Sequence, residues 1–316
     1  MKKTLDIRHV PNMQKARDRQ AKEMILIRDE LAIPHSLKAY AEGKYYYIRT
    51  YGCQANVRDE ETMAGMLESA GFRHTMDYKQ ADIILINTCA VRENAEDKVY
   101  GEVGSLKSLK TAKPNVVLGL CGCMVQQTTV VDTVSSKFQH VDLILGTHNI
   151  LSLLDLLDEV ITKKVRIIDV ESKPGEVIEN LPSVRNDKFK AFVNIMYGCD
   201  KFCTYCIVPY TRGRERSRLI DDILQECRLL VEQGYQEITL LGQNVNAYGK
   251  DLKNGTTFAL LLEEVAKLGI PRLRFTTSHP WDFSQEMIDV IARYDNVMKS
   301  IHLPFQSVND EILRKM

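Results

Sequence analysis

The sequence predicts an α/β protein in which an open parallel sheet is followed by a partial (β/α) barrel. From residue 45 onward, short apolar runs alternate with helical patterns, which is typical of parallel strands joined by crossover helices. Several of these runs are followed directly by cysteine. Because parallel strands end at one edge of their sheet, the sequence also predicts that these thiols gather at that edge.

Composition bounds the class of protein. The 316 residues, 44% apolar and 27% charged, predict about two globular domains. Basic and acidic side chains are equal at 42 each, so net charge neither favours nor excludes a nucleic-acid partner. Eight cysteines, several in metal-like settings, indicate a reducing compartment. We therefore expect a cytoplasmic protein, and no apolar run near the amino terminus is long enough for a signal peptide or a membrane span.

The first half of the chain is divided into an extension and a domain. Residues 1–43 are charged and are predicted to be a variable extension with one helix over 15–31. A cluster-binding domain is expected over 44–162. Its helix after Cys53 could be capped by Asn56, and a leucine-rich helix completes it. The expected strands and closing helix of this domain cover 45–51, 82–87, 116–120, 141–145 and, for the helix, 150–161.

The second half begins with a proline- and glycine-containing linker over 163–189, in which 165–170 could form a short strand. An incomplete barrel is expected over 190–316, and Cys227 on its first helix is expected to lie in the core of this domain. The final residues resemble the first turns of a helix without a terminal cap, so we expect a truncated chain. The predicted strands cover 191–197, 237–241, 272–276 and 298–303, and the helices cover 219–233, 258–268 and 285–294.

Three thiols occupy one short loop after the first barrel strand, in the order Cys199, Cys203 and Cys206. Thiolates are soft ligands that suit iron–sulfur clusters or zinc, and a closed tetrahedral site needs four. A cubane held by three cysteines keeps one iron open for a small molecule. The alternative is half of a zinc ribbon, which requires a second Cys-x2-Cys pair that the sequence lacks.

Three strands of the first domain also end in cysteine. Cys53 follows the first strand, Cys89 the second, and Cys121 and Cys123 the third. Three thiols from three strands can converge on one cluster at the sheet edge. The alternative is that they are scattered core residues, because free cysteine is often buried.

The string from Cys203 to Arg218, CTYCIVPYTRGRERSR, resembles the radical S-adenosylmethionine methylthiotransferase family. The segments TYGCQAN, NTCAVR and GCM resemble its amino-terminal cluster motifs, which implies that Cys53, Cys89 and Cys123 are ligands and Cys121 is a spare thiol. The resemblance departs from the family pattern at Val125 and at Val308, where alanine and glycine are usual. It also implies a larger barrel and a small RNA-binding domain, both absent here.

This resemblance implies two [4Fe-4S] clusters and S-adenosylmethionine as cofactors. The cosubstrate would bind the open iron held by Cys199, Cys203 and Cys206, and its radical product would attack C2 of N6-(dimethylallyl)adenosine beside the tRNA anticodon, where a methylthio group is installed. Tyr205, Gly242, Gln243 and Asn244 are expected near the cosubstrate. The implied partners are tRNA, a low-potential electron donor and a sulfur donor.

Other interpretations stay open at this point. Four arginines, at positions 212, 214, 216 and 218, could meet RNA phosphates near the reactive centre or form a solvated basic face. A methylthiotransferase could instead act on threonylcarbamoyladenosine in tRNA or on a ribosomal protein. An electron-transfer metalloprotein or an inactive fragment of the enzyme are the further alternatives.

Overall fold

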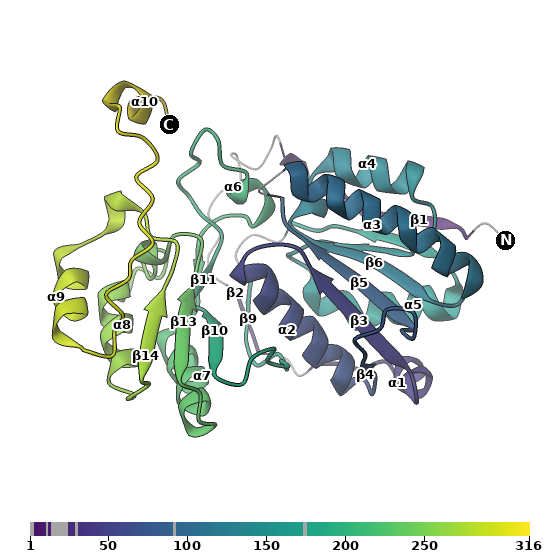
Figure 1. The fold of residues 1–316 in the computed structure, drawn as a ribbon, viewed down its shortest axis with the longest axis horizontal. Helices are drawn as coiled ribbons and strands as arrows, with labels where there is room; N and C mark the ends of the chain where they lie inside the picture. The colour runs from purple at the N-terminus through teal and green to yellow at the C-terminus, as the bar shows by residue number, and fades with distance from the viewer. Residues whose placement is uncertain (1–2, 11, 14–24, 29–30, 91–92, 173–175) are drawn as a thin grey trace.

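The computed structural model describes residues 3–10, 12–13, 25–28, 31–90, 93–172 and 176–316. Two α/β domains lie side by side (Figure 1), an N-terminal domain drawn in purple to teal and a C-terminal domain in green to yellow. Each is built around a parallel sheet. Within the described residues, no helix combines the length and the apolar character needed to cross a bilayer.

The N-terminal domain contains a seven-stranded sheet in which every pair is parallel. Its central strands are apolar runs that are buried along their whole length, as expected when helices cover both faces. The strand order is β1 (Leu5–His9), β8 (Arg166–Asp169), β7 (Leu143–Leu145), β6 (Val117–Gly122), β5 (Ile83–Thr88), β3 (Tyr45–Thr50) and β4 (Arg73–His74).

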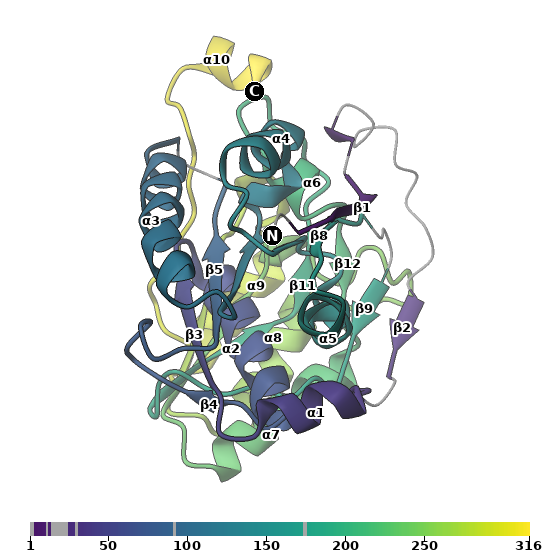
Figure 2. The same cartoon turned by 90° about the vertical axis from the view of Figure 1, so that its right-hand side faces the viewer.

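Helices lie on both faces of this sheet (Figure 2). A hydrophobic cluster fills the space between the sheet and the helices on each face. Side chains of one face pack under α1 (His35–Ala41), α2 (Gln54–Ser69) and α5 (Leu153–Lys163). Those of the other face pack under α3 (Glu93–Ala112) and α4 (Thr128–Lys137). Both faces are therefore covered, and the carboxyl edge of the sheet is left as the place where loops carry polar and thiol side chains.

The predicted charged extension takes part in the fold. β1 pairs with β8 at one edge of the sheet, and α1 buries Leu37 and Ala41 in the core. The helix expected over 15–31 is wrong at residues 25–27, which form β2 (Ile25–Ile27) paired with β9 (Glu176–Ile178), and most of its remainder lies outside the described residues. β8, which falls in the predicted linker, belongs to the sheet, so the N-terminal domain extends to Asp169.

The C-terminal domain follows the predicted strand–helix order. Its parallel sheet contains β10 (Lys190–Asn194), β13 (Glu237–Leu241) and β14 (Arg272–Phe275). Helices α7 (Ile220–Glu232), α8 (Phe258–Ala266) and α9 (Gln285–Arg293) pack on it around one apolar cluster. Cys227 on α7 is fully buried in this cluster, as predicted.

The fourth barrel strand expected over 298–303 is wrong. The chain makes a single isolated bridge between Leu273 and Val297 and then continues without strand pairing. Ile301 and Leu303 are exposed, because no described element packs over them. The helix expected after Asn309 is present as α10 (Asp310–Lys315), and the Asn309 side chain caps it.

Candidate metal centres at the domain junction

The three-cysteine loop, residues 198–206, leaves the sheet through the short strand β11 (Met196–Tyr197). Gly198 has a φ of +72°, and a side chain there would meet the Arg214 carbonyl oxygen at 2.0 Å. Only glycine allows the backbone to turn this closely. Cys199 is buried at the base of the loop, whereas Cys203 and Cys206 are partly exposed.

The chain returns along the loop and holds it in place. The Cys199 amide donates to the Gly213 carbonyl (3.1 Å), and Asp200 pairs with Arg214 (2.6 Å). The return segment ends in β12 (Arg216–Ser217), which pairs antiparallel with β11. Burial raises the pKa of the Cys199 thiol to about 12, so without a metal this sulfur is a neutral thiol at neutral pH. A bound metal would have to displace that proton.

Cys53, Cys89 and Cys123, the N-terminal trio, lie at the carboxyl ends of β3, β5 and β6. A hydrogen bond with Cys89 lowers the pKa of Cys53 to about 5, although burial opposes it. The Cys53–Cys89 pair therefore releases a proton more readily than a lone thiol does. Cys53 remains exposed, whereas Cys89 and Cys123 are buried. The structure thus brings thiols from three strands to one edge.

Backbone geometry fixes this edge. Gly122 has a φ of +95°, and a side chain there would lie 2.4 Å from the Thr88 carbonyl oxygen. The proposed cap at Asn56 is wrong, because α2 begins at Gln54 directly after Cys53. Asn56 is instead buried, and its amide donates to the Thr88 carbonyl (2.9 Å) while Asn87 donates to the Asn56 carbonyl (2.7 Å). These bonds hold the segments that carry the trio in register.

Cys121 lies one residue before this turn and inside β6, where it faces the apolar core and its sulfur is 3.7 Å from the sulfur of Met63. Burial raises its pKa above the range in which a thiol ionises near neutral pH. It therefore behaves as a spare, apolar thiol.

The arginine segment, residues 212–218, is neither a solvated face nor a free phosphate-binding surface. Arg212, Arg216 and Arg218 are all less than 9% exposed. Arg218 donates to Glu179 and Glu226, and Arg216 stacks on the Tyr197 ring beside His148. For Arg212, Arg216 and Arg218 the two predicted alternatives are therefore both wrong, because the acidic partners of these arginines are distant in sequence and formed no visible charge pattern. Arg214 is partly exposed and pairs with Asp200.

Arg212 joins the two sets of cysteines. It follows Cys206 by six positions, after the short helix α6 (Val208–Thr211). Its Nε lies 3.1 Å from the Cys123 sulfur, and its other arm donates to Asp59 (2.7 Å). Burial raises the pKa of Cys123, Arg212 works to lower it, and Asp59 works to raise it. The three-cysteine loop and the N-terminal trio are thus connected through one buried cation.

The spacing of the sulfurs is informative about the metal. A tetrahedral zinc ion with Zn–S bonds of about 2.3 Å places its sulfur ligands about 3.8 Å apart. In the part of the chain that the structure describes, neither set of three cysteines has all its sulfurs within 4.8 Å of one another. Neither set is therefore arranged as a zinc site in this structure, and soft thiolate donors are the ligands of iron–sulfur clusters.

The predicted cosubstrate residues come from two segments, the three-cysteine loop and the segment that follows β13. Tyr205, in the loop, is 55% exposed. Gly242, just after β13, lies against Met196, since a side chain there would be 2.7 Å from Met196 Cγ. Gln243 is partly exposed and Asn244 is buried, with its amide donating to Asp282 (2.7 Å).

Asp282 is a residue that the sequence did not single out. It accepts from Asn244, from Lys201 in the three-cysteine loop (2.7 Å) and from Lys250 (2.5 Å). Burial works to raise the pKa of Asp282, but these donors outweigh it and lower the pKa to about 2. This carboxylate therefore ties the loop to the segment after β13. An isolated aspartate after a Pro-Trp pair carries no sequence pattern that would have indicated this role.

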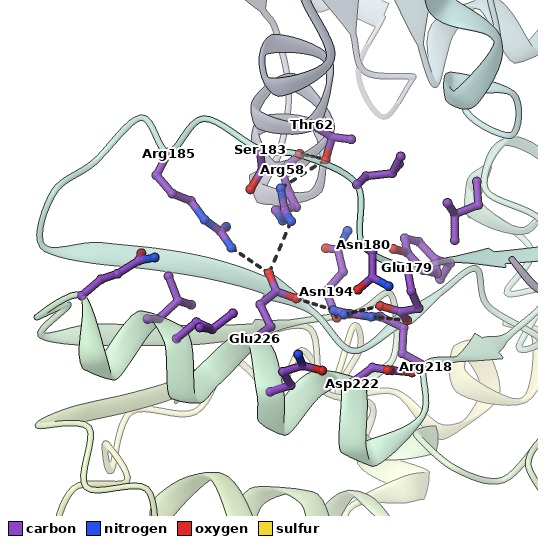
Figure 3. A pocket seen from close by; sticks show the side chains of 17 residues that line it. Arg58, Thr62, Glu179, Asn180, Ser183, Arg185, Asn194, Arg218, Asp222 and Glu226 are labelled. Carbon is purple, nitrogen blue, oxygen red and sulfur yellow. Dashed lines mark hydrogen bonds and ion pairs between the residues drawn. The ribbon is translucent and has the colours of Figure 1, made fainter. Parts of the chain in front are cut away.

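An ion-pair cluster joins the two domains beside a cavity of about 380 Å³ (Figure 3). Arg58 and Glu61 come from α2, Arg185 from the linker, and Glu226 from α7. Arg185 binds both carboxylates, at 2.8 Å and 2.7 Å, and Arg218 binds Glu226 on the opposite side. Because its charges are paired with one another, this cavity is a structural junction rather than an anion-binding site.

We expect the Glu226→Gln variant to lose on the order of 3 kcal/mol of unfolding free energy at neutral pH, because it leaves buried guanidinium groups without their carboxylate. Burial works to raise the pKa of Glu226, but Arg218, Arg58 and Arg185 lower it to about 2. A free glutamate titrates near about 4.3, so the native advantage is present above that pH and is lost as pH falls toward 2.

The measurement is urea unfolding of the parent protein and of Glu226→Gln, from pH 7 down to the lowest pH at which unfolding is reversible. It gives the difference in unfolding free energy at each pH. Glu159→Gln is the control, because Glu159 forms a more exposed pair with Arg8 and its loss should cost about 1 kcal/mol or less. Equal losses in the two variants, or a Glu226 effect that grows toward low pH, would contradict the argument.

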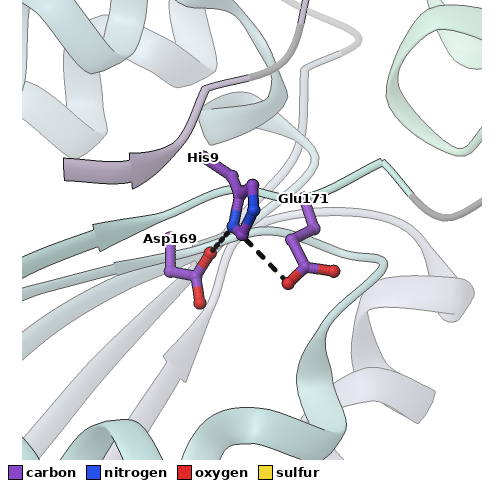
Figure 4. A group of neighbouring side chains, drawn as sticks. All are labelled: His9, Asp169 and Glu171. Carbon is purple, nitrogen blue, oxygen red and sulfur yellow. Dashed lines mark hydrogen bonds and ion pairs between the residues drawn. The ribbon is translucent and has the colours of Figure 1, made fainter.

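A further group of potential metal ligands lies at the ends of β1 and β8 (Figure 4). His9 Nδ1 is 2.8 Å from Asp169 and 3.5 Å from Glu171. The His9 side chain is 59% exposed, and it already makes a hydrogen bond with Asp169. This contact fastens the edge strand β1 to the sheet.

Two family models match the chain. Residues 45–146 match the Uncharacterized protein family UPF0004, and residues 193–316 match the Radical SAM superfamily. The first match covers β3 to β7 with the N-terminal trio, and the second covers the C-terminal domain with the three-cysteine loop. The superfamily brings a [4Fe-4S] cluster and S-adenosylmethionine as cofactors.

Curated relatives are similar over 97% or more of the chain. It is 54% identical to a tRNA-2-methylthio-N(6)-dimethylallyladenosine synthase of Shouchella clausii, covering 97% of this chain and 59% of that protein. It is 52% identical to one of Bacillus subtilis, covering 98% of this chain and 61% of that protein. The chain thus spans about three fifths of the length of these relatives.

Among solved structures, the radical S-adenosylmethionine methyltransferase TsrM from Kitasatospora setae matches with a TM-score of 0.57. That match covers 85% of this chain and 60% of TsrM at 14% identity, so it supports the fold alone. The relatives, the two consecutive family matches and the fold agree. The chain belongs to the radical S-adenosylmethionine methylthiotransferase family, in which it is similar to the tRNA-2-methylthio-N(6)-dimethylallyladenosine synthases.

Proposed function

We propose that this chain carries the cluster-binding and radical-generating part of a tRNA methylthiotransferase. Its substrate is N6-(dimethylallyl)adenosine beside the anticodon, and its product is the 2-methylthio derivative. One observation carries the proposal: Arg212, six positions after the last thiol of the three-cysteine loop, reaches the N-terminal domain and lies 3.1 Å from the Cys123 sulfur of the other set of three thiols. Methylthiolation needs a sulfur-bearing site close to the site at which the substrate carbon is activated.

In this proposal Cys199, Cys203 and Cys206 hold a [4Fe-4S] cluster with one open iron. When bound, the cluster supplies the electron that splits S-adenosylmethionine into a radical able to remove hydrogen from carbon. The protein orients the cosubstrate. Tyr205 offers an exposed ring for stacking, and Asn244 is held by Asp282, which also binds the loop through Lys201.

The N-terminal trio holds the second [4Fe-4S] cluster, on which the sulfur for transfer is carried. The hydrogen bond with Cys89 lowers the pKa of Cys53, which favours the thiolate form that binds iron. The other two ligands, Cys89 and Cys123, are buried at the same edge of the sheet. The exposed position of Cys53 leaves a path to solvent, through which a sulfur donor can reach the site.

The partners that follow are tRNA, a low-potential electron donor and a sulfur donor. None of the eight cysteines, all of which lie in the described residues, forms a disulfide, which fits assembly of clusters in the reducing cytoplasm. Buried arginines leave the tRNA contacts to other surfaces. The exposed aromatic side chains Tyr205, Trp281 and Phe305 lie on the C-terminal domain and offer stacking partners for unpaired bases.

The test is anaerobic turnover after reconstitution with iron and sulfide. The protein, a chemical reductant and S-adenosylmethionine are combined with tRNA that carries N6-(dimethylallyl)adenosine. We expect 5′-deoxyadenosine together with the 2-methylthio nucleoside, both detected by mass spectrometry. Matched tRNA with unmodified adenosine, tRNA with threonylcarbamoyladenosine and the ribosomal protein substrate are run in parallel. Modification of the threonylcarbamoyladenosine tRNA or of the ribosomal protein, with no modification of the tRNA that carries N6-(dimethylallyl)adenosine, would overturn the substrate assignment.

A further inference from the structure

The N-terminal trio receives a side chain from the other domain. Arg212 is anchored in the C-terminal domain, yet its guanidinium lies between Asp59 and Cys123 of the N-terminal domain. It is 6% exposed, and Asp59 is 7% exposed. The N–H groups of a buried arginine normally donate to oxygen acceptors. Here the Arg212 Nε–H is directed at the Cys123 sulfur, 3.1 Å away.

We propose that Arg212 sets the reduction potential of the second cluster by donating a hydrogen bond and a positive charge to the Cys123 sulfur, a role that rests on the cluster assigned to the N-terminal trio above. Reduction adds one electron from the external low-potential donor and makes or breaks no bond. The reduced cluster carries one more negative charge, so a nearby cation and a hydrogen bond to a ligand sulfur favour it and raise the potential.

Asp59 fixes the magnitude of this effect. Its carboxylate binds the far arm of the guanidinium (2.7 Å), which holds the Nε–H directed at Cys123 and partly offsets the positive charge. Asn56 supports the same arm at 3.4 Å. The nearer charge dominates at the sulfur because Coulomb energy falls with distance. Arg212 and Asp59 therefore act on the cluster with opposite signs.

Arg212 also makes the second cluster dependent on the contact between the two domains. The carbonyl of the preceding residue, Thr211, accepts a hydrogen bond from Thr147 of the N-terminal domain (2.8 Å). Arg212 follows Cys206 by six positions, so one short segment carries both the last thiol of the three-cysteine loop and the donor to Cys123. The position of the donor to Cys123 therefore depends on this contact between the two domains.

The test isolates the second cluster in the Cys199→Ala/Cys203→Ala/Cys206→Ala background, in which about four irons per chain are expected to remain. Midpoint potentials are measured by redox titration with electron paramagnetic resonance detection. In Arg212→Gln/Asp59→Asn, which leaves no unpaired buried charge, we expect a more negative midpoint. A tenfold fall in the ratio of reduced to oxidised cluster at fixed potential corresponds to a shift of about 59 mV for one electron. In Asp59→Asn alone we expect a more positive midpoint.

Arg185→Gln is the control, because Arg185 is a partly buried arginine of the interdomain ion-pair cluster that touches no cysteine in the described structure. It should weaken the domain junction and leave the midpoint unchanged. Arg212→Lys keeps the positive charge and is measured as well, so that a result is available if the double variant does not hold iron. Its midpoint potential should stay near that of the parent. A double variant with an unchanged midpoint, or shifts of the same sign in both Asp59 variants, would overturn the proposal.

If the parent background itself holds no iron, the second cluster and with it the proposed function are wrong. If the parent holds iron but the midpoints do not respond, only the role of Arg212 is wrong. The two failures are therefore distinguishable in one experiment, and neither depends on turnover of tRNA.

Discussion

Replacing Cys199, Cys203 and Cys206 together by alanine is expected to abolish cleavage of S-adenosylmethionine and to lower iron from about eight to about four atoms per chain. The loop would lose all three thiolate donors, and no other cysteine in the described structure lies on it. The N-terminal trio comes from different strands and should retain its iron. Iron and acid-labile sulfide after anaerobic reconstitution, with 5′-deoxyadenosine formation, measure both effects.

Cys227→Ala is the matched control, because this thiol is buried in the apolar core of the C-terminal domain and belongs to neither set. It should keep its full iron content and lose only about 1 kcal/mol of stability through a small cavity. About four irons in the parent protein that do not change in the triple variant would show that the loop holds no cluster. Zinc in place of iron would contradict the radical chemistry altogether.

Gly122→Ala is expected to remove the second cluster and to lower the unfolding free energy by on the order of 3 kcal/mol. A positive φ costs a side-chain-bearing residue about 1–2 kcal/mol, and the added carbon would lie 2.4 Å from the Thr88 carbonyl and 2.5 Å from the Asn87 side chain. Relief of this contact must move the backbone that carries Cys89 or Cys123. Iron content and urea unfolding of the same preparation test both expectations.

Gly234→Ala is the control that separates the cost of a positive φ from the cost of a close contact made by the added side chain. Gly234 has a similar φ of +85°, but a side chain there meets nothing within 4 Å. This control should lose only about 1–2 kcal/mol and keep all of its iron. If Gly122→Ala retained about eight irons per chain, the tight turn between β6 and Cys123 would not be what positions the N-terminal trio.

Local patterns predicted the elements that position the site. β5 and β6 are runs of apolar residues bounded by polar ones, and the structure places them within two residues of the expected bounds. A cysteine directly after such a run must lie near the sheet edge, so the positions of Cys89 and Cys123 follow from strand order alone. The order itself follows from short crossover connections between parallel strands.

Contacts between distant segments were not predictable in the same way. β1 is a five-residue stretch with mixed polarity, and its partner β8 begins about 160 residues later. The arginine segment looked like a surface charge run because nothing near it in sequence is arranged to neutralise it. Its partners Asp59, Glu179 and Glu226 are supplied by other elements after folding. Burial of charge is a property of the tertiary structure, which a local pattern does not record.

The error over residues 298–303 has a related cause. Those residues have the apolar content of a strand, but a strand is stable only when a neighbour pairs with it and a layer covers it. The single bridge at Val297 provides neither along their length. The side chains that the pattern assigns to a core are exposed instead.

The edge position of β1 has a consequence for handling the protein. β1 covers β8, whose four residues are buried, and His9 fastens it through Asp169. Removal of the first nine residues, or a bulky fusion that pulls them away, would uncover a row of unpaired amides and carbonyls on β8. Such an open edge pairs readily with another chain. Loss of these residues would therefore be felt first as aggregation, while every cysteine ligand remained in place.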